Sequence, residues 1–382
     1  MMRDQSCCAK RLKAIVGAVY DRAHSGKLCP RVLEIVRGHP LMAAPCRACI
    51  RSAHRPRLQV ALVVVLTLSL VSCAKPADDK AEKTGGESIA VFTKNQTNPY
   101  FRTVRLGAEN AAKQMNATVI QYIPTKQDSI PEQLSEIEDA IIKRPGAVVF
   151  IPVDSKAMVP GIEKLNAANI PVVNITDRVL GGQSISFMGC DESSVSLNTG
   201  RFLLQKLNGH GNVIILEGQG GSQNNANRVG AFKQAIAEFP NVKLLASQPA
   251  AFQRVQALHV TENLLQSYPQ IDGILAANDA MALGAIEALD AAKRKALVVG
   301  LNGTKEAIDA IKEGKLLATG DCDGFMHGCL GTMAAVRHLR NLPVPKEFIF
   351  SLMVIDNSNF AGMDVPYEKR MCPPWESVVK SN

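Results

Sequence analysis

From residue 88 onward, short apolar segments alternate regularly with segments of helical periodicity. The apolar segments are rich in Val and Ile, as the buried strands of a parallel sheet are. The segments between them repeat apolar residues at helical spacing over about 10–15 residues. This alternation predicts βαβ units and an α/β fold. The expected strands are 88–92, 118–122, 147–151, 171–175, 212–216, 242–246, 273–276, 296–300, 317–319 and 349–354, and the expected helices are 103–115, 129–143, 159–168, 197–207, 227–238, 254–267, 280–291, 305–313 and 325–339.

The alternation runs through the chain twice with a similar rhythm. It therefore predicts two consecutive doubly wound parallel-sheet lobes. About 300 residues follow the leader described below, which is enough for two domains that each have a core. In open α/β sheets ligands bind outside the carboxyl ends of the strands. We therefore expect a ligand site in the cleft between the lobes.

The chain begins with the features of an export signal. Four arginines between residues 47 and 57 precede the apolar run 58–71, and small residues follow it. The run is shorter than the roughly 20 residues that span a bilayer, so it is typical of a secretory signal rather than a membrane helix. We expect residues 1–73 to be a leader and signal peptide that sends the rest to the periplasm or cell envelope. Residues 1–46 fit no part of a normal signal. Either translation starts at Met42, so that residues 1–41 are not translated, or the segment is a cytosolic extension.

The end of the signal, Leu-Val-Ser-Cys at 70–73, resembles a bacterial lipobox. The resemblance implies that Cys73 is lipidated and anchors the protein to a membrane. Ordinary cleavage, which leaves a free soluble protein, is the alternative. The residues of 74–87 are small and polar, which predicts a flexible spacer between the anchor and the fold.

The net charge of +8 belongs to the leader. The first 72 residues hold 12 of the 43 Lys and Arg and only 3 of the 35 Asp and Glu, which leaves 31 basic and 32 acidic residues in the remainder. Because the exported part is nearly neutral, it has no excess of positive charge to attract a polyanion, and we expect no binding to nucleic acid.

Four cysteines follow Cys73: Cys190, Cys322, Cys329 and Cys372. An exported protein can form disulfides, and four cysteines allow three full pairings between which the sequence cannot choose. Because most of them lie far apart in the chain, the sequence favours unpaired thiols. No spacing typical of a metal site occurs among them, and we expect neither a metal nor a cofactor.

Several segments at strand ends resemble the periplasmic sugar-binding proteins of the ribose-binding type. The resemblance extends over about residues 88–355, and the order and spacing of the segments are specific to that family. It implies a type I periplasmic binding fold, two lobes joined by a hinge of three crossings. The matching segments are 97–101 (TNPYF), 176–178 (TDR), 227–232 (NRVGAF), 246–252 (ASQPAAF), 277–284 (ANDAMALG) and 298–304 (VVGLNGT).

The resemblance also implies the residues that hold the sugar. Aromatic rings cover the apolar faces of a sugar, and planar polar groups bind its hydroxyls. The ring platforms would be Tyr100, Phe101 and Phe252. The hydroxyl partners would be Asp177, Arg178, Arg228, Asn278 and Asn302, with Asn98 assisting and Cys322 at the hinge side.

Each of these residues also has a structural alternative. The three aromatic residues could belong to the core, although Asn98 and Pro99 are expected to hold Tyr100 and Phe101 in a turn after the first strand. Arg228 could lie on a solvated helix face, and the pair 177–178 could be a surface ion pair. Asn278 and Asp279 could cap the helix that follows, or Asn278 could face the ligand while Asp279 caps.

The sequence departs from the ribose-binding pattern at two places. Leu301-Asn302 stands where that family has Phe-Asp, and Cys322 stands where it has a glutamine. An asparagine both donates and accepts, so it suits a different hydroxyl pattern. We therefore expect another pentose, a hexose, a deoxy sugar or a polyol rather than ribose itself. The loop 218–222 (GQGGS) lacks the lysine of a phosphate-binding loop, and we interpret it as the rim of the cleft.

By the same resemblance, the hinge crossings lie at Cys190-Asp191, Cys322-Asp323 and Ser351-Leu352. The first lobe would then comprise 88–190 and 323–351, and the second 191–322 and 352–382, including a tail to which we assign no role. Two of the crossings carry cysteines, which leads to the hypothesis that Cys190 and Cys322 can form a disulfide that limits hinge motion.

These features predict the substrate-binding component of an ABC-type sugar import system. It would act as a monomer, capture a small neutral sugar or polyol between closing lobes and deliver it to a membrane permease. A sensory protein that presents the sugar to a chemoreceptor or sensor kinase shares every pocket residue and stays an alternative. An exported enzyme acting on sugars is disfavoured because the expected cleft has no Ser-His-Asp order, no metal cluster and only one confident carboxylate.

Overall fold

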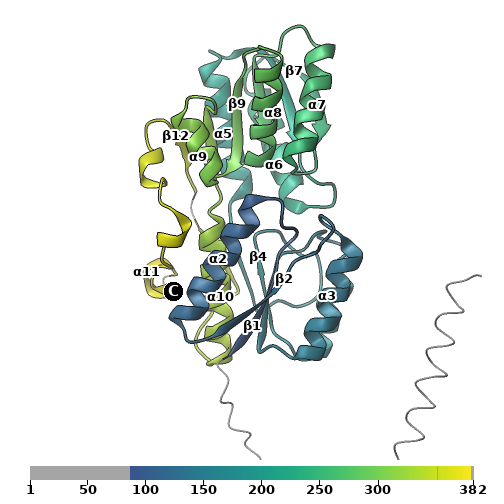
Figure 1. Ribbon diagram of the computed structural model, residues 1–382, viewed down its shortest axis with the longest axis vertical. Coiled ribbons are helices and arrows are strands. Elements are labelled where there is room, and N and C mark those ends of the chain that lie inside the picture. The colour runs from purple at the N-terminus through teal and green to yellow at the C-terminus, as the bar shows by residue number, and fades with distance from the viewer. Residues whose placement is uncertain (1–86, 351, 380–382) are drawn as a thin grey trace, which may run out of the picture. The chain divides into compact units, whose positions relative to one another are not determined.

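The structure, a computed structural model, describes residues 87–350 and 352–379. The expectations for the leader, the spacer up to residue 86, Cys73 and Ser351 fall outside these residues. The described chain forms two α/β lobes, each built on a six-stranded sheet (Figure 1). Within this part of the chain no helix is long and apolar enough to cross a membrane.

The first lobe has helices on both faces of its sheet. Its elements are β1 (Ser88–Phe92), α2 (Pro99–Gln114), β2 (Thr118–Tyr122), α3 (Ile130–Lys143), β3 (Ala147–Phe150), α4 (Val159–Ala167), β4 (Val172–Ile175), β5 (Ser186–Cys190), α10 (Gly324–Leu339) and β11 (Glu347–Phe350). The strand order is β11-β5-β4-β3-β1-β2, and every neighbouring pair is parallel. Alternate residues of a strand point to opposite faces. Val91 therefore packs toward α2 and α10, and Phe92 toward α3 and α4.

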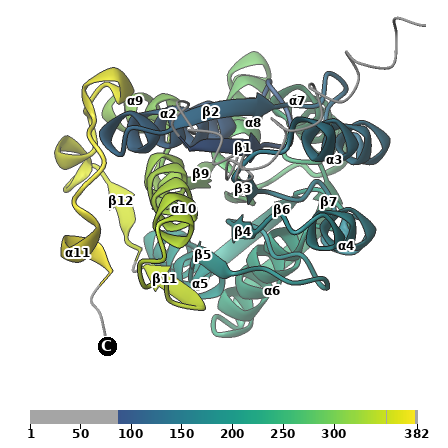
Figure 2. The same cartoon turned by 90° about the horizontal axis from the view of Figure 1, so that it is seen from below.

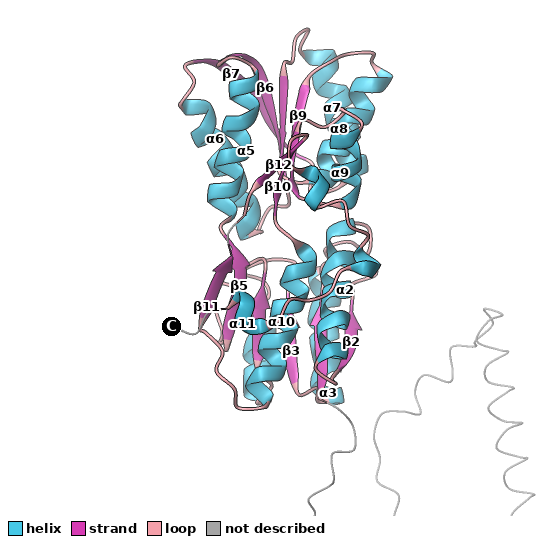
Figure 3. Ribbon diagram, turned by 90° about the vertical axis from the view of Figure 1, so that its left-hand side faces the viewer, coloured by secondary structure: helices cyan, strands magenta, loops and turns pink. Residues whose placement is uncertain are grey.

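The second lobe repeats this plan. Its elements are α5 (Glu192–Lys206), β6 (His210–Glu217), α6 (Gln223–Ala237), β7 (Asn241–Pro249), α7 (Arg254–Ser267), β8 (Gly273–Ala276), α8 (Asp279–Ala291), β9 (Leu297–Asn302), α9 (Lys305–Lys312), β10 (Ala318–Asp321) and β12 (Val354–Asp356). The strand order is β12-β10-β9-β8-β6-β7, and only β12 is antiparallel to its neighbour. Helices α5 and α6 cover one face, and α7, α8 and α9 the other (Figure 3). The two doubly wound lobes expected from the sequence are confirmed.

Two glycines let α2 and α10 pack at close range. A Cβ atom on Gly107 would lie 2.0 Å from the carbonyl oxygen of Phe325, and one on Gly328 would lie 1.9 Å from that of Val104. Both positions therefore exclude a side chain. This close packing fixes α10 against the helix whose first turn faces the cleft.

The chain passes from one lobe to the other between β5 and α5, between β10 and α10, and between β11 and β12. At two of these crossings an aspartate caps the helix that follows. Asp191 accepts a hydrogen bond from the Ser194 amide at 3.0 Å, and Asp323 accepts one from the Phe325 amide at 3.0 Å. The caps set where each strand of one lobe turns into a helix of the other.

Several helices begin earlier than expected. Helix α2 begins at Pro99, α5 at Glu192 and α6 at Gln223 because Asn98, Asp191 and Ser222 cap them. Their first turns are polar or face the cleft, so the apolar periodicity starts only one turn later. Tyr100 and Phe101 accordingly lie in the first turn of α2 rather than in a separate turn.

Two strands also differ from the expected pattern. Strand β5 is not among the strands predicted from the sequence, although all five of its residues are buried. The expected strand 349–354 is two strands, β11 and β12, which belong to different sheets. The apolar run is continuous in sequence, but the chain changes lobes within it.

The tail after β12 first follows the second lobe. Asp364 pairs with Lys305 at 3.2 Å and with Lys312 at 3.1 Å, both on α9. The hydroxyl of Tyr367 accepts a hydrogen bond from the Lys305 amide at 2.7 Å. This part of the tail contacts the lobe to which the sequence analysis assigned it.

Beyond Arg370 the tail crosses to the first lobe, so the assignment of the whole segment 352–382 to the second lobe is wrong. Arg370 pairs with Asp323 at the second crossing. Cys372, Trp375 and Val379 are then buried in the core of the first lobe. The short helix of this segment, α11 (Trp375–Val378), lies on the side of α10 (Figure 2). Burial of these apolar side chains draws the chain across the hinge.

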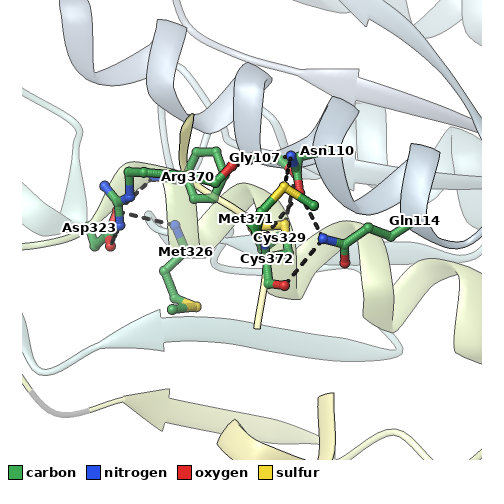
Figure 4. The surroundings of a disulfide bond; sticks show 10 residues. Gly107, Asn110, Gln114, Asp323, Met326, Cys329, Arg370, Met371 and Cys372 are labelled. Atoms are coloured by element: carbon green, nitrogen blue, oxygen red, sulfur yellow. Dashed lines mark hydrogen bonds and ion pairs between the residues drawn. A yellow bond between two sulfur atoms is a disulfide. The ribbon is translucent and has the colours of Figure 1, made fainter. Parts of the chain in front are cut away.

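A disulfide between Cys329 of α10 and Cys372 anchors the tail (Figure 4). Their Cα atoms lie 5.6 Å apart, within the usual range for this bond. Asn110 accepts from the Cys372 amide at 3.0 Å, and Gln114 donates to the Cys372 carbonyl at 3.3 Å. The expectation of unpaired thiols is wrong for this pair, because the sequence did not reveal that the tail folds back on α10.

We expect the Cys329→Ala/Cys372→Ala double variant to be less stable to urea by roughly 3–4 kcal/mol, because the bond closes a segment of 43 residues in the unfolded chain. Urea unfolding of the oxidised wild type, the reduced wild type and the double variant measures this. A reductant should leave the double variant unchanged. If reduction leaves the wild type equally stable, the tail is anchored by packing alone.

Candidate functional site

A cavity of about 40 Å³ lies between the two lobes. Residues at the carboxyl ends of strands and at the first turns of helices line it, as the parallel topology requires. The first lobe contributes Lys94, Asn98, Tyr100, Phe101, Thr176 and Asp177, and the second contributes Ser222, Asn224, Arg228, Phe252, Asn278 and Asn302.

Eight of the residues expected at the site line this cavity. They come from the start of α2, the loop after β4, helix α6, the loops after β7 and β8, and the end of β9. The set consists of Asn98, Tyr100, Phe101, Asp177, Arg228, Phe252, Asn278 and Asn302.

Two expected residues lie elsewhere. Arg178 stacks over the ring of Phe187 at 3.7 Å and pairs with Glu347 of β11, so it faces solvent. Its neighbour Asp177 turns inward, at the bend that follows β4, where Thr176 has a positive φ angle of 58°. Cys322 is fully buried at the hinge, beside Cys190, and does not reach the cavity. Neither residue lines the cavity, so the structure does not bring Arg178 or Cys322 together with the other expected residues.

Four further residues line the cavity although they are not among those predicted from the sequence: Lys94, Thr176, Ser222 and Asn224. Each of them lies just after β1 or β4 or at the start of α6. The rule that ligands bind outside the carboxyl ends of parallel strands could therefore have predicted them. Lys94 was overlooked because an isolated lysine after a strand is usually solvated, whereas here it is only 7 % exposed. Ser222 ends the glycine-rich loop that the sequence analysis placed at the rim of the cleft.

Asp177 is the centre of the hydrogen-bond network of the first lobe. Lys94 donates to it at 2.8 Å, Ser222 at 2.5 Å and the Asn224 amide at 3.1 Å. Burial alone would raise the pKa of Asp177, but the charge of Lys94 and the hydrogen bonds hold that pKa below its usual value. The side chain is therefore an ionised carboxylate at neutral pH.

The same network holds the two lobes together. Ser222 and Asn224 belong to the second lobe, and Asp177 belongs to the first. Beside them, the Ser155 amide donates to the carbonyl of Gly221 at 3.0 Å, and the Gln223 amide donates to the Ser155 hydroxyl at 3.2 Å. The loop before α6 and the loops after β3 and β4 therefore form a latch that closes the cleft.

Arg228 is the centre of the second lobe's network. Its Nε and Nη2 donate to the two oxygens of Glu192 at 2.6 and 2.9 Å. Its Nη1 donates to the carbonyl of Ala277 and to Oδ1 of Asn302, both at 2.8 Å. Burial would lower the pKa of Arg228, but the carboxylate of Glu192 more than offsets that effect and raises it.

Three rings border the cavity. Tyr100 and Phe101 are 5 % and 6 % exposed and also belong to the core of the first lobe. They therefore serve both as core residues and as lining of the cavity. Phe252 follows Ala251, and both have positive φ angles, 59° and 52°. Such a backbone is costly for a bulky residue and is common at functional sites. A Cβ on Gly218 would lie 2.1 Å from the Phe252 ring, so only glycine leaves room for it.

The two asparagines that precede helices serve as caps and also line the cavity. Oδ1 of Asn98 accepts from the Tyr100 amide at 3.0 Å, and Oδ1 of Asn278 accepts from the Met281 amide at 2.9 Å. Asn278 is thus the cap of α8, and the suggestion that Asp279 caps it is wrong. Asp279 instead accepts from Thr304 and Thr319, and burial raises its pKa to about 6.

One group of side chains in the described part of the chain has metal-ligand geometry: Cys190, Glu192 and Cys322, whose ligand atoms lie within 4.8 Å of one another. Both oxygens of Glu192 already bind Arg228. A cation would have to break a buried ion pair, which is strongly unfavourable. The arrangement favours ordinary thiols beside a salt bridge.

We expect Glu192→Gln to lower the free energy of unfolding by about 3 kcal/mol, because it leaves the buried guanidinium of Arg228 without a counter-charge. Arg228→Met should cost a similar amount, and the double variant less than the two single variants together. Urea unfolding measures all three.

The matched control is the pair of Arg201 and Glu238, which is also bidentate, at 2.6 Å for both bonds, but exposed. Glu238→Gln should cost less than about 1 kcal/mol. If Glu192→Gln and Glu238→Gln lower the free energy of unfolding equally, burial is not what makes the pair of Arg228 and Glu192 important for stability.

The buried His327 of α10 should make the free energy of unfolding depend on pH. Its Nδ1 lies 3.1 Å from the hydroxyl of Tyr100, and burial lowers its pKa from 6.5 to about 4. The unfolded chain thus takes up this proton at a higher pH than the folded chain. The neutral, buried imidazole therefore adds about 3 kcal/mol to the free energy of unfolding above pH 6.5, and this addition is lost as the pH falls toward 4.

We therefore expect the stability difference between wild type and His327→Gln to shrink from pH 7 to pH 4.5. Urea unfolding of both proteins at the two pH values measures it, and the comparison removes the effect of the other titrating groups. A difference that is the same at both pH values would contradict the low pKa of His327.

The chain matches the family model of the periplasmic binding protein domain over residues 89–343. It is 33 % identical over 292 residues to the ribose import binding protein of Haemophilus influenzae, an alignment that covers 76 % of this chain and 96 % of that protein. It is 31 % identical over 240 residues to the D-allose-binding periplasmic protein of Escherichia coli, covering 60 % and 77 %.

Among solved structures, a periplasmic solute-binding protein of an ABC transporter from Actinobacillus succinogenes, with bound D-allose, superposes with a TM-score of 0.69 at 32 % identity. The superposition covers 72 % of this chain and 99 % of that one. A solute-binding protein from Bacillus halodurans with bound myo-inositol gives 0.67 at 26 % identity, covering 73 % and 98 %. The chain belongs to the periplasmic binding protein family, in the branch that resembles the ribose-binding proteins.

Proposed function

We infer that this chain is the substrate-binding component of an ABC-type sugar import system and works in the periplasm. Its relatives are named for ribose import, D-allose, xylitol and D-apiose. Solved relatives hold D-allose and myo-inositol. The ligand of this chain would accordingly be a monosaccharide or a cyclic or open-chain polyol.

The observation that carries the proposal is the charge balance of the cavity. Its three charged lining residues are Lys94, Asp177 and Arg228. Lys94 pairs with Asp177, and Arg228 pairs with Glu192 just behind it. Among the described residues that line the cavity no charge is left over for an ionic ligand, and burying an unpaired charge is costly. The site therefore suits a neutral molecule with many hydroxyl groups, which the asparagine side chains bind and the rings cover.

The arrangement supports binding without catalysis. Among the described residues that line the cavity, Asp177 is the one carboxylate, and its oxygens accept hydrogen bonds from Lys94, Ser222 and Asn224. Hydrolysis of a glycoside uses two carboxylic groups in defined positions. We propose that the protein acts on its sugar by capture and release alone.

Capture follows from the latch between the lobes. A sugar that contacts residues of both lobes binds the closed form more tightly than the open form, and so shifts the protein toward the closed form. A membrane permease would then recognise the closed, loaded protein, which would work as a monomer.

A thermal-shift screen of the purified protein against pentoses, hexoses, deoxy sugars, polyols and sugar phosphates tests this proposal. We expect one neutral sugar or polyol to raise Tm. At a concentration a hundred times its Kd, the ligand should raise the free energy of unfolding by about 2.7 kcal/mol. Phe252→Ala and Lys94→Met should abolish the shift.

Arg178→Ala is the matched control, since Arg178 lies beside Asp177 in the chain but faces solvent. It should keep the full shift. A shift with sugar phosphates alone would contradict the neutral site, and no shift with any compound would overturn the sugar-binding proposal.

A further inference from the structure

Two thiols meet at the hinge. Cys190 ends β5 and Cys322 follows β10, so each stands at a crossing between the lobes. Their Sγ atoms lie 3.2 Å apart, and the residues are 8 % and 0 % exposed. A disulfide bond is about 2.0 Å long, so a relative shift of about 1.2 Å would allow the bond to form.

These thiols contact the network that positions Arg228. The Sγ of Cys190 lies 3.5 Å from Oε1 of Glu192, and the Sγ of Cys322 lies 3.4 Å from Oε2. Glu192 holds Arg228, and Arg228 holds Asn302 in the wall of the cavity. A change at the two sulfur atoms therefore reaches the ligand site through a single carboxylate.

We propose that Cys190 and Cys322 form a reversible disulfide site at the hinge, and that its oxidation is coupled to closure of the lobes around the ligand. The existence of the site does not depend on which ligand the protein binds. The coupling rests on the proposed sugar-binding function.

The reaction needs an external disulfide as oxidant, either a small-molecule disulfide or the active-site disulfide of a thiol oxidase. One thiolate of the pair attacks this disulfide and forms a mixed disulfide, and one thiol of the oxidant leaves. The second thiolate then displaces the other thiol of the oxidant. In sum, two protein thiols lose two protons and two electrons and form one S–S bond, and the oxidant becomes two thiols.

The oxidant has a path to the pair. A hollow of about 290 Å³ on the hinge side is lined by Cys190 together with Thr176, Asp191 and Asn227. The hydrogen bond with Cys322 and burial raise the pKa of Cys190, and burial raises that of Cys322. Both groups are therefore thiols at neutral pH, and we expect slow oxidation that starts at Cys190.

A disulfide fits this site better than a metal ion does. A cation would need an oxygen of Glu192, and both oxygens bind Arg228. The disulfide needs no ligand exchange, only the approach of two sulfur atoms. The chain also forms the Cys329–Cys372 disulfide, as an exported protein can.

The coupling has a definite direction. The sulfur atoms meet in the structure in which the latch of Ser155, Asp177 and Ser222 is closed. A bond formed in this geometry favours the closed form. By linkage, a sugar that favours the closed form favours the disulfide to the same degree.

The first test maps the thiols. The protein is equilibrated in glutathione buffers of graded redox potential, free thiols are alkylated, and peptides are identified by mass spectrometry. We expect a Cys190–Cys322 linked peptide that disappears in reducing buffers, and no such peptide in Cys190→Ser. Full alkylation of both thiols in every buffer overturns the site. Zinc ion is the second probe: stoichiometric zinc bound by the reduced protein, lost in Cys190→Ser, would overturn the disulfide in favour of a metal site.

The second test measures the coupling. Calorimetry with the sugar identified by the thermal-shift screen should give a Kd at least about fivefold lower for the oxidised pair than for the reduced pair. Cys190→Ser/Cys322→Ser is the matched control, because it keeps Cys329–Cys372, and its Kd should not depend on the redox buffer. Equal Kd values for the two states of the wild type overturn the coupling. If no sugar binds in either state, the proposed function fails, while the peptide map still decides whether the disulfide exists.

Discussion

The ion pair between Arg228 and Glu192 is the interaction on which the cleft side of the second lobe depends. It joins the first turn of α5 to α6, and through Ala277 and Asn302 it reaches the ends of β8 and β9. A buried pair of this kind is tolerated only when the remaining donors and acceptors are satisfied. Besides its two hydrogen bonds to Glu192, Arg228 donates from Nη1 to Ala277 and Asn302, and these two bonds help to meet that condition. The guanidinium therefore has one position, and the wall of the cavity is fixed with it.

The recognition groups also have structural roles in the fold. Asn98 and Asn278 cap helices, Tyr100 and Phe101 belong to the core, and Asp177 holds the latch. Groups that the fold already immobilises lose little freedom when a ligand arrives, and such preorganisation favours binding. The same arrangement constrains change, since a substitution that alters specificity also touches a cap, a core contact or the latch.

Much of the architecture could be predicted because a parallel sheet leaves a strong pattern of buried apolar strands and periodic helices. The same topology located most of the cavity, since polar residues after such strands gather at one edge. What the pattern could not show was direction: Asp177 and Arg178 are adjacent, yet one is buried in the network and the other pairs with Glu347 in solvent.

Long-range pairing was also beyond the reach of the sequence. Glu192 and Arg228 lie in separate segments, and neither residue indicates its partner, whereas the resemblance did place Cys190 and Cys322 on neighbouring crossings. The apolar run 349–354 does not show where one strand ends and the next begins; only the family resemblance placed a crossing within it, at Ser351-Leu352. The path of the tail was missed for a related reason, because only the packing of Trp375 against the first lobe reveals it.

The path of the tail sets an order for folding. The strands of the second lobe, β12 apart, lie between residues 210 and 321 and can pair once that stretch has left the ribosome and the membrane. The first lobe takes its parts from both sides of that stretch, and its core waits for Cys372 and Trp375. Until they arrive, the outer surface of α2 and α10 stays uncovered and Cys329 has no partner. The lobe that begins first in the sequence is thus the one completed last, because Cys372 and Trp375, which cover α10, come near the end of the chain.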